Sequence, residues 1–304
     1  MDLIEKIRKR IPLLQDCVKI EVITKGFSSD VKYIVHNSNE EKYLLRTANM
    51  TQFSRKKEEY AILAELYKEK VNSPKPIEIG RLTDLEICYY LLSYIEGEDA
   101  RDLLPLHNHE VQFEIGRKAG EDLRKINCIH APSTIAPWYE RKVNKYRDYL
   151  ETYKICGIEI KGDQKVVEFI ERNINALKNR PNRFLHDDFH VGNLIVHDAK
   201  YAGVIDFNRF DWGDPYLEFL KIGLFSREIS VPFSNGQIHG YFKNNIPDNF
   251  WQLYSLYLAM ELFSAVVWTQ KVVPEKLVEM LERIEMILED HKGFKLYTPT
   301  WYND

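Results

Sequence analysis

The sequence changes character near Gly97. Before this point short β-rich runs alternate with polar turn-forming residues, whereas after it long helical patterns dominate. The elements predicted before Gly97 are strands at 20–23, 31–35 and 42–46, a helix at 54–70 ended by Pro74 and Pro76, and strand-like runs around Ile77 and at 87–95. The pattern predicts an α+β protein with a small β-rich N-terminal lobe and a larger, mainly helical C-terminal lobe.

The predicted division assigns residues 1–95 to the first lobe and 96–304 to the second, with the join near 93–98. Helices are predicted in the second lobe near 108–127, 137–153, 164–178, 214–226, 249–270 and 275–290. One interruption, at 184–210, consists of short strands and loops and holds most of the polar residues that suggest chemistry.

Composition excludes several classes of protein. The 304 residues are 44% apolar and 29% charged with a net charge of −4, which is typical of a soluble globular protein and does not suggest nucleic-acid or membrane binding. Four scattered cysteines form no metal-binding or disulfide pattern. The N-terminus lacks the apolar stretch of a signal peptide, and the apolar segment 253–268 is interpreted as a core helix. We therefore predict a cytoplasmic protein.

The segment 184–206 carries the strongest functional signal. Apolar runs flank Asp188, Asn193 and Asp206, so these polar side chains are expected at the ends of short strands. Phosphoryl transfer needs an acceptor for the substrate hydroxyl proton and oxygen ligands for Mg²⁺. Asp188 suits the first role, and Asn193 and Asp206 suit the second. The alternative is that these residues only cap turns and that His186 and His190 are structural; we prefer structural roles for the two histidines alone.

The order His186-x-Asp188-x-x-x-x-Asn193, followed by Asp206, matches the protein-kinase pattern. With His190 two residues after Asp188 and Ile-Asp-Phe around Asp206, the segment resembles the aminoglycoside phosphotransferase and choline kinase-like family. The resemblance implies a protein-kinase-like fold, Mg²⁺, and ATP or GTP as co-substrate. Asp188 would then be the catalytic base, and Asn193 and Asp206 the metal ligands.

The N-terminal part resembles the same family more weakly. Gly26, Ser28 and Ser29 lie in a turn between two predicted strands, where backbone N–H groups can bind phosphates, although a plain hairpin is the alternative. Arg46 ends the third strand, where relatives carry a phosphate-contacting Lys or Arg. Glu59 matches the helical partner of that residue, with Glu58 as its competitor.

The segment 91–97 resembles the hinge of the family. By that resemblance the backbone carbonyl of Ser93 and the backbone N–H of Ile95 would bind the adenine edge, with Leu92 at the back of the pocket. A plain buried strand is the alternative.

Three positions depart from the family pattern. Asp187 replaces the Gly that usually precedes the catalytic Asp, which places a second carboxylate beside the base. Glu218 replaces the last Asp of the G-D-P-x-x-D segment that follows Trp212, and Asn127 replaces a His near the end of a helix. The change at Asn127 is expected to affect packing rather than chemistry.

An aminoglycoside is polycationic, so its pocket needs carboxylates. The candidates are Asp187, Asp211, Asp214, Glu218 and Glu261. In relatives the residues at Asp214 and Glu218 are more often structural, where they anchor the catalytic loop or start a helix. Glu261 lies in an apolar helix, where it either pairs with an Arg or lines a ligand pocket.

The resulting prediction is a small-molecule kinase that transfers the γ-phosphoryl group to a hydroxyl of an aminoglycoside-like substrate, with antibiotic resistance as a possible role. One alternative is a kinase of the same fold that acts on an amino sugar, a choline-like alcohol, a ketoamine or a macrolide. Another is a nucleotide-binding scaffold without catalysis. The sequence leaves the acceptor, the choice of ATP or GTP, and the oligomeric state open.

Overall fold

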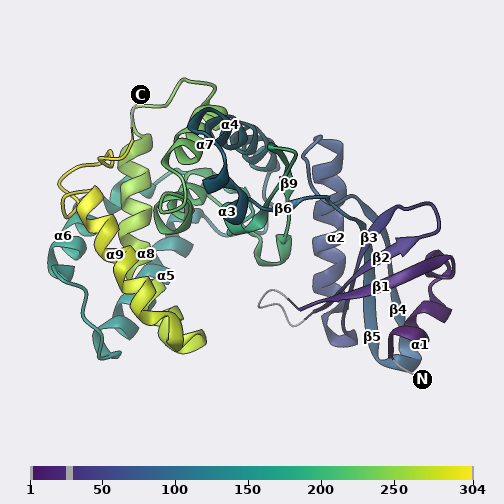
Figure 1. Ribbon diagram of the computed structural model, residues 1–304. Helices are drawn as coiled ribbons and strands as arrows, with labels where there is room; N and C mark the ends of the chain where they lie inside the picture. Colours follow the sequence, from purple (N-terminus) through teal and green to yellow (C-terminus); the bar gives the residue numbers. More distant parts are fainter. Residues whose placement is uncertain (1–2, 25–29, 303–304) are drawn as a thin grey trace. The chain divides into compact units, whose positions relative to one another are not determined.

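The computed structural model describes residues 3–24 and 30–302, which form two compact units (Figure 1). The first unit comprises the chain up to Gly97 together with Ala202–Asn208, and the second comprises Glu98–Tyr201 together with the chain from Arg209. The sequence had assigned all of 96–304 to the second lobe. The structure instead places Asp206, within Ala202–Asn208, in the first unit.

The first unit is built on a five-stranded antiparallel sheet in the order β1-β2-β3-β5-β4. Its strands are β1 (Cys17–Ile23), β2 (Val31–Asn37), β3 (Lys42–Asn49), β4 (Pro76–Leu82) and β5 (Ile87–Ser93). Helix α1 (Leu3–Arg10) precedes the sheet, and α2 (Phe53–Lys68) follows β3 and packs on β4 and β5. The five predicted strands and the helix after the third are confirmed, whereas α1 had not been predicted.

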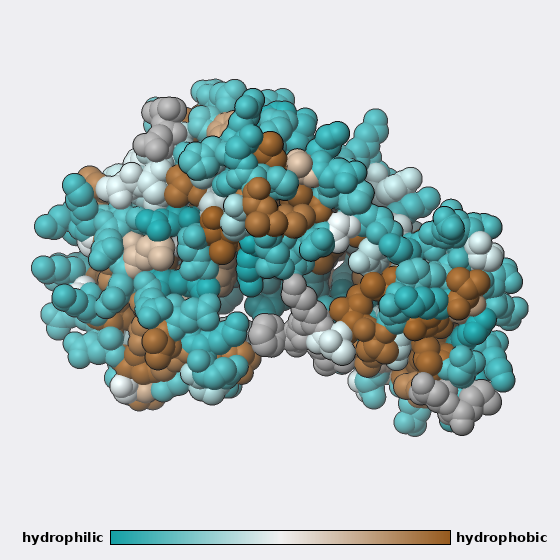
Figure 2. All heavy atoms as spheres, viewed as in Figure 1, coloured by the Kyte–Doolittle hydropathy of each residue, from teal (hydrophilic) through white to brown (hydrophobic). Residues whose placement is uncertain are grey.

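The core of the first unit is formed where α1 meets the sheet. Ile7 and Ile11 of the α1 segment and Leu45 of β3 are fully buried in one cluster with Tyr33 and Val35 of β2. The edge strand β1, by contrast, leaves apolar side chains in water, and Figure 2 shows brown apolar atoms among the teal ones on this unit. Val18 and Val22 are the exposed valines of this edge strand.

The second unit is mainly helical. Its helices are α3 (Ala100–Leu103), α4 (His109–Ile126), α5 (Trp138–Ile155), α6 (Asp163–Asn173), α7 (Val231–Phe242), α8 (Phe250–Val272) and α9 (Leu277–Asp290). Helix α8 is apolar on all sides and is packed by α5, α6 and α9 (Figure 1). It is the one helix of the described chain that is long and apolar enough to cross a membrane, yet 78% of its most apolar window is buried, as the predicted core helix requires.

Helices α4 and α7 approach each other unusually closely. Each carries two glycines four residues apart, Gly116 and Gly120 in α4 and Gly236 and Gly240 in α7. A Cβ added at Gly120 would lie 2.1 Å from the Gln237 carbonyl oxygen, and the other three positions are as tight. The two backbones are therefore in direct contact, which only glycine permits.

Short strands carry the segment with the strongest functional signal. β7 (Arg183–Leu185) pairs with β10 (Asp211–Gly213), and β8 (Leu194–His197) lies between β6 (Glu98–Asp99) and β9 (Lys200–Val204). The loop from His186 to Asn193 connects β7 to β8, so both of its ends are held by strand pairing.

In the second lobe one predicted helix is wrong and one helix, α7, was not predicted. Residues 214–226 do not form an α-helix: a 3-10 segment, Pro215–Phe219, and a π-helical turn, Ile222–Ser226, replace it. Helix α7 was not predicted because its sequence contains Pro232, Asn235 and two glycines, all poor helix formers. Its close packing on α4 overrides this weak local preference.

Candidate active site

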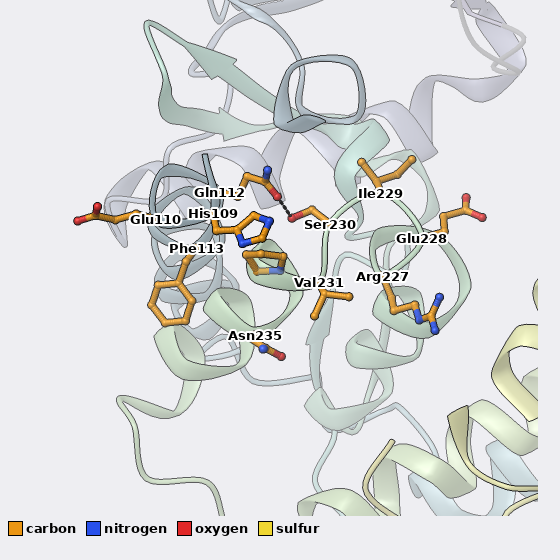
Figure 3. Close-up of a pocket in the computed structure, with 11 residues that line it drawn as sticks. His109, Glu110, Gln112, Phe113, Arg227, Glu228, Ile229, Ser230, Val231 and Asn235 are labelled. Atoms are coloured by element: carbon orange, nitrogen blue, oxygen red, sulfur yellow. Dashed lines mark hydrogen bonds between the residues drawn. The ribbon is translucent and has the colours of Figure 1, made fainter. Parts of the chain in front are cut away.

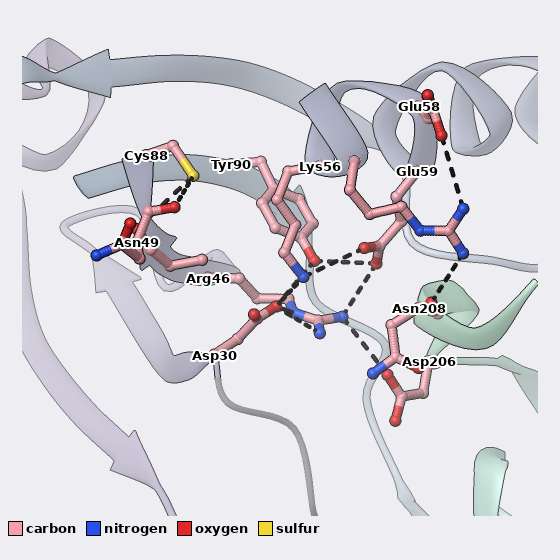
Figure 4. Close-up of polar contacts among 12 residues, drawn as sticks. Asp30, Arg46, Asn49, Lys56, Glu58, Glu59, Cys88, Tyr90, Asp206 and Asn208 are labelled. Carbon is pink, nitrogen blue, oxygen red and sulfur yellow. Dashed lines mark hydrogen bonds and ion pairs between the residues drawn. The ribbon is translucent and has the colours of Figure 1, made fainter. Parts of the chain in front are cut away.

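In the first unit, Arg46 is the centre of a buried cluster of charges (Figure 4). Its Nη2 donates to Asp30 Oδ2 at 2.7 Å, and its Nη1 donates to Glu59 Oε1 at 3.2 Å. Its Nη1 also lies 3.6 Å from Asp206 Oδ1. The Arg46 side chain is only 4% exposed. Glu59, and not Glu58, is thus the helical partner of Arg46; Glu58 pairs with Arg55 instead.

Three members of this cluster, Asp30, Lys56 and Tyr90, were missed in the sequence. Lys56, one turn before Glu59 on α2, donates to Asp30 Oδ2 at 2.6 Å, and the Tyr90 hydroxyl donates to Glu59 Oε1 at 2.9 Å. The three-residue spacing of Lys56 and Glu59 was the available signal for the lysine. Burial alone would lower the pKa of Arg46, but Tyr90, Glu59, Asp206 and Asp30 together raise it, so the guanidinium stays charged.

Removing Arg46 is expected to destabilise the protein. Arg46→Met leaves the Asp30 and Glu59 carboxylates buried with one cation fewer, and breaking a buried ion pair in this way costs about 3–5 kcal/mol. Urea unfolding measures the change. Arg55→Met removes an exposed arginine of the same unit and should cost less than about 1 kcal/mol. Equal effects of the two substitutions would contradict the buried network.

Two of the other predicted nucleotide-binding positions, Ser93 and Ile95, lie at the end of β5. Gly26, Ser28 and Ser29 fall outside the described residues. Ser93 is the last residue of β5, and its hydroxyl accepts a hydrogen bond from the Lys75 backbone N–H at 2.8 Å. Ile95 follows β5 outside any strand, and no backbone hydrogen bond among the described residues uses its N–H.

In the second unit, both carboxylate oxygens of Asp188 are held. Oδ1 lies 3.2 Å from Lys221 Nζ and 3.5 Å from His190 Nε2, and Oδ2 accepts from Asn193 Nδ2 at 3.1 Å. Burial raises the pKa of Asp188, but the His190 hydrogen bond and the Lys221 charge outweigh it and hold the pKa far below its ordinary range. Asp188 is therefore a carboxylate at any physiological pH.

Side-chain to backbone hydrogen bonds hold the loop from His186 to Asn193 and the strand that precedes it. His186 is fully buried, and its Nδ1 accepts the Asp188 backbone N–H at 3.2 Å, while His190 Nδ1 accepts from Gly192 N–H at 3.1 Å. These contacts agree with structural roles for both histidines. Asn127 Nδ2 donates to the Phe184 carbonyl at 2.8 Å, so the residue at this departure from the family pattern supports the strand that leads into the loop.

Asp187 adopts the left-handed backbone region, with φ of 62°. This region favours glycine, which explains why a Gly is usual before the catalytic Asp; Asp is among the few other residues that tolerate it. Burial raises the pKa of Asp187, and the nearby cations Lys221 and Lys145 oppose the shift.

The predicted substrate carboxylates divide into two groups. Glu218 is 2% exposed and accepts the backbone N–H groups of His186 and Asp187 at 2.5 and 3.2 Å, and Asp211 accepts from Arg141 Nη2 at 2.6 Å. Both are thus engaged within the protein. No hydrogen bond or ion pair to another described residue engages the carboxylates of Asp187 and Glu261.

Asp214 has the structural role that the sequence suggested. It is fully buried, Arg180 binds it through two hydrogen bonds of 2.6 and 2.8 Å, and the Tyr257 hydroxyl donates to it at 2.6 Å. Trp138 Nε1 in turn donates to the Tyr257 oxygen at 2.8 Å. One carboxylate therefore ties the end of β10 to α5 and α8.

The buried position of Glu218 gives stability a pH dependence. Burial and the Asp187 charge raise the pKa of Glu218 from 4.5 to about 8, against the two N–H groups that it accepts. Between these values the native state binds more protons than the unfolded chain. The free energy of unfolding should therefore fall as pH rises through this window, by at most about 1.4 kcal/mol per pH unit for one proton.

Urea unfolding at several pH values tests this expectation. Glu218→Gln should flatten the decline, because the amide does not titrate. The exposed Glu275→Gln is the matched control and should leave the decline as it is in the wild type. A decline that survives in Glu218→Gln would assign it to another group.

The oxygen atoms predicted to bind Mg²⁺ suit that ion in each unit. Asp206 Oδ1 is buried and has no hydrogen-bond partner among the described residues, and its backbone is left-handed with φ of 69°. Asn193 directs its Nδ2 to Asp188, which leaves its amide oxygen as a ligand. Carboxylate and amide oxygens, completed by phosphates and water, are the ligands that Mg²⁺ prefers. No group of three or more His, Cys, Asp or Glu in the described part of the chain makes a metal site from protein alone.

A pocket of about 830 Å³ lies elsewhere in the second unit, between the N-terminal ends of α4 and α7 (Figure 3). Ser230, the N-cap of α7, donates to Gln112 of α4 beside it. No residue of the loop from His186 to Asn193 lines this pocket, so it is separate from the catalytic candidates.

Comparison with known proteins agrees with this arrangement. The chain is similar in fold to the GDP complex of wild-type aminoglycoside 2'-phosphotransferase-IIIa (13% identity, 94% of this chain and 98% of that chain covered, TM-score 0.67). It is also similar to a thermostable mutant of aminoglycoside phosphotransferase APH(4)-Ia in ternary complex with ADP and hygromycin B (12%, 95% and 98%, 0.69). A third similar structure is the gentamicin–APH(2")-IIa complex (15%, 98% and 99%, 0.63).

These likenesses confirm the predicted kinase-like fold. Comparison of the sequence with curated proteins gave no match. The sequence profile of the phosphotransferase enzyme family, APH, matches residues 19–252, which include Arg46, Asp188, Asn193 and Asp206. The chain therefore belongs to the phosphotransferase enzyme family.

Proposed function

We propose that the protein transfers the γ-phosphoryl group of ATP or GTP to a hydroxyl of a small molecule. The hydroxyl oxygen attacks the γ-phosphorus, the bond from that phosphorus to the oxygen bridging to the β-phosphate breaks, and the nucleoside diphosphate leaves. The hydroxyl proton passes to Asp188. The observation that carries the proposal is the Asp188 carboxylate, fixed by Lys221 on one oxygen and by Asn193 on the other.

The low pKa of Asp188 suits this type of reaction. Phosphoryl transfer has a loose transition state, so catalysis depends on positioning and charge stabilisation more than on a strong base. Asp188 therefore orients the hydroxyl by accepting its hydrogen bond, and it takes the proton late. Lys221 keeps the carboxylate ionised and its direction fixed.

Other residues have roles in nucleotide binding under this proposal. Arg46, held by Glu59 and Asp30, binds the nucleotide phosphates, and the Ile95 N–H, which donates to no described backbone carbonyl, binds the adenine edge together with the Ser93 carbonyl. Bound Mg²⁺, held by Asn193 and Asp206, would neutralise charge on the phosphates. The loop containing Gly26, Ser28 and Ser29 keeps its predicted phosphate contact as part of the proposal.

For the acceptor, an aminoglycoside-like compound is the first candidate, since the similar structures include complexes with gentamicin and with hygromycin B. A second candidate, another hydroxylated metabolite, is favoured by the cation of Lys221, which lies against Asp188 in the loop from His186 to Asn193, the catalytic loop. A scaffold without catalysis is disfavoured, because Asp188, Asn193 and Asp206 are all retained. A cytoplasmic location and the absence of nucleic-acid and membrane partners stay predictions.

The test is a transfer assay with ATP and with GTP over aminoglycosides, macrolides, choline, amino sugars and hydroxylated amino acids. Mass spectrometry identifies phosphorylated products, and thermal shift reports nucleotide binding. We expect a product that requires Mg²⁺ and disappears with a chelator. Nucleotide binding without any product would contradict the proposed catalysis and favour the scaffold.

A further inference from the structure

Lys142, on α5, is a buried cation without a charged partner in contact. The residue is 6% exposed, and among the described residues no hydrogen bond or ion pair engages its ammonium group. Its nearest aromatic neighbour is the Tyr257 ring, whose centroid lies 5.8 Å from Nζ. A lone buried charge destabilises a protein, so a lysine at such a position needs a reason beyond packing.

Lys221 provides the contrast within the same unit. It is also largely buried, but it pairs with Asp188 at 3.2 Å, and the charges of Asp188 and Asp187 raise its pKa against burial. Burial lowers the pKa of Lys142, and the more distant charge of Glu261 only partly compensates. Of these two buried lysines, Lys221 pairs with the Asp188 carboxylate, whereas Lys142 has no counter-ion in contact among the described residues.

Helix α5 is fixed to the strands that hold the catalytic loop. Arg141, next to Lys142, donates to the Trp212 carbonyl at 2.5 Å and to Asp211 Oδ1 at 2.6 Å. Asp211 stands opposite Leu185 in the β7–β10 ladder, and Leu185 directly precedes the loop. The first turns of α5 therefore lie beside the catalytic loop.

Four ionisable side chains of this region lack a direct partner. They are the cations of Lys142 and Lys145 and the carboxylates of Asp187 and Glu261, and no ion pair or hydrogen bond within the described chain engages them. Contacts between elements bring them into one region. Lys142 Nζ lies 5.8 Å from the centroid of the Tyr257 ring, one turn before Glu261 on α8. Arg141, beside Lys142, binds Asp211, which stands opposite Leu185, two residues before Asp187. They thus lie near one another without closing an ion pair.

A groove of about 500 Å³ runs along α5, and of these four groups Lys145 is the one that lines it. Its lining includes Arg141, Asn144, Lys145, Asp148 and Tyr149. Cations, a carboxylate and neutral polar groups alternate along it. A polycationic acceptor would bring its amines close to Lys142, Lys145 and Lys221, whereas a purely anionic acceptor would face Asp187 and Glu261.

We infer that the acceptor is zwitterionic, a hydroxylated amino acid or an amino sugar acid. Its ammonium group is bound by Asp187 and Glu261, and its carboxylate by Lys142 and Lys145. The inference rests on the proposed function, since it names the acceptor whose hydroxyl is presented to Asp188. It also explains why the four groups are unpaired in the protein alone, because the ligand supplies a counter-ion for each.

The test uses a matched set of compounds: an amino sugar acid, its amide, which keeps only the cation, and its N-acetyl derivative, which keeps only the anion. Hydroxylated amino acids and their amides form a second set. Calorimetry measures binding without nucleotide, and the transfer assay gives kcat and KM. We expect the zwitterion to bind about 10- to 100-fold more tightly than either derivative, as charge-assisted hydrogen bonds imply.

Lys142→Met distinguishes a ligand-binding lysine from a structural one. Methionine keeps the apolar stem, so the variant should be at least as stable as the wild type, while KM for the zwitterion rises about 10-fold or more and kcat changes little. The amide derivative, which has no carboxylate for Lys142 to bind, should bind Lys142→Met as tightly as it binds the wild type. Lys142→Arg, which keeps the charge, should retain part of the preference for the zwitterion, and Glu261→Gln should weaken binding of the amide.

Each result bears on one claim. If the wild type shows no preference for the zwitterion in both sets, or if Lys142→Met binds it as tightly as the wild type does, the inference is overturned, whatever the transfer assay shows. If the zwitterion binds with the expected preference but no compound is phosphorylated, the proposed function fails and the binding site stands.

Discussion

Asp188→Asn is expected to lower kcat by about 10²- to 10⁴-fold, the contribution typical of a positioned proton acceptor. The amide oxygen of the variant is a poor proton acceptor, and its amide nitrogen is a donor that faces the ammonium of Lys221 or the Nδ2 group of Asn193. The transfer assay with the acceptor panel, in which mass spectrometry quantifies the phosphorylated products, measures the loss of kcat. Nucleotide binding, followed by thermal shift, should persist because Arg46 and its partners are untouched.

Asp198→Asn is the matched control. Asp198 is an exposed carboxylate, 86% exposed, in the turn that follows β8, so its replacement makes the same chemical change close to the loop in sequence. This variant should keep the wild-type kcat. Full activity of Asp188→Asn would remove the central role assigned to Asp188, and equal losses in both variants would indicate a general effect on folding.

Gly120→Ala is expected to destabilise the second unit by about 3 kcal/mol or more. The added methyl group would lie 2.1 Å from the Gln237 carbonyl oxygen, and a backbone atom cannot move aside as a flexible side chain can. In a helix without this contact, the same substitution stabilises by about 1 kcal/mol, because alanine is the better helix former. The sign of the effect therefore reports the backbone contact between α4 and α7.

Urea unfolding measures the effect, with Lys118→Ala on the exposed side of α4 as the control. That control should change stability by less than about 0.5 kcal/mol. Gly236→Ala, on the partner helix, should match Gly120→Ala because its methyl group meets the Phe113 carbonyl oxygen at 2.1 Å. An increase in stability in either glycine variant would show that the helices do not touch in solution.

The elements with strong local patterns could be predicted from the sequence. The strands β1 to β5 are short β-rich runs bounded by turn-forming residues, and helices α4 and α9 carry apolar residues at helical spacing on their buried sides. Helix α7 could not be predicted in this way, because its glycines and Pro232 oppose helix formation and only contact with α4 stabilises it. The four-residue spacing of Gly116 and Gly120, repeated by Gly236 and Gly240, was the signal that could have revealed the pair.

The catalytic loop could be predicted because its residues are consecutive, whereas the charge network around Arg46 could not. Asp30 and Lys56 reach Arg46 from different elements, and long-range pairing of this kind leaves no local pattern. The family resemblance suggested a structural role for Glu218, but not its contacts, since its carboxylate accepts N–H groups from residues 31 and 32 positions away. Two of the carboxylates predicted to bind substrate, Asp211 and Glu218, therefore form hydrogen bonds within the protein.

The most direct test of the central claim follows a label from the nucleotide to the acceptor. Purified protein, Mg²⁺ and the acceptor panel are incubated with ATP labelled either at the γ-phosphate or at the α-phosphate, and the products are separated. We predict that the γ-label becomes covalently attached to an acceptor hydroxyl and that the α-label remains in the diphosphate. In Asp188→Asn the attachment of the γ-label should be slower by about 10²- to 10⁴-fold. Transfer of the α-label, or γ-label found only as inorganic phosphate with every acceptor, would contradict the assignment of this protein as a small-molecule kinase.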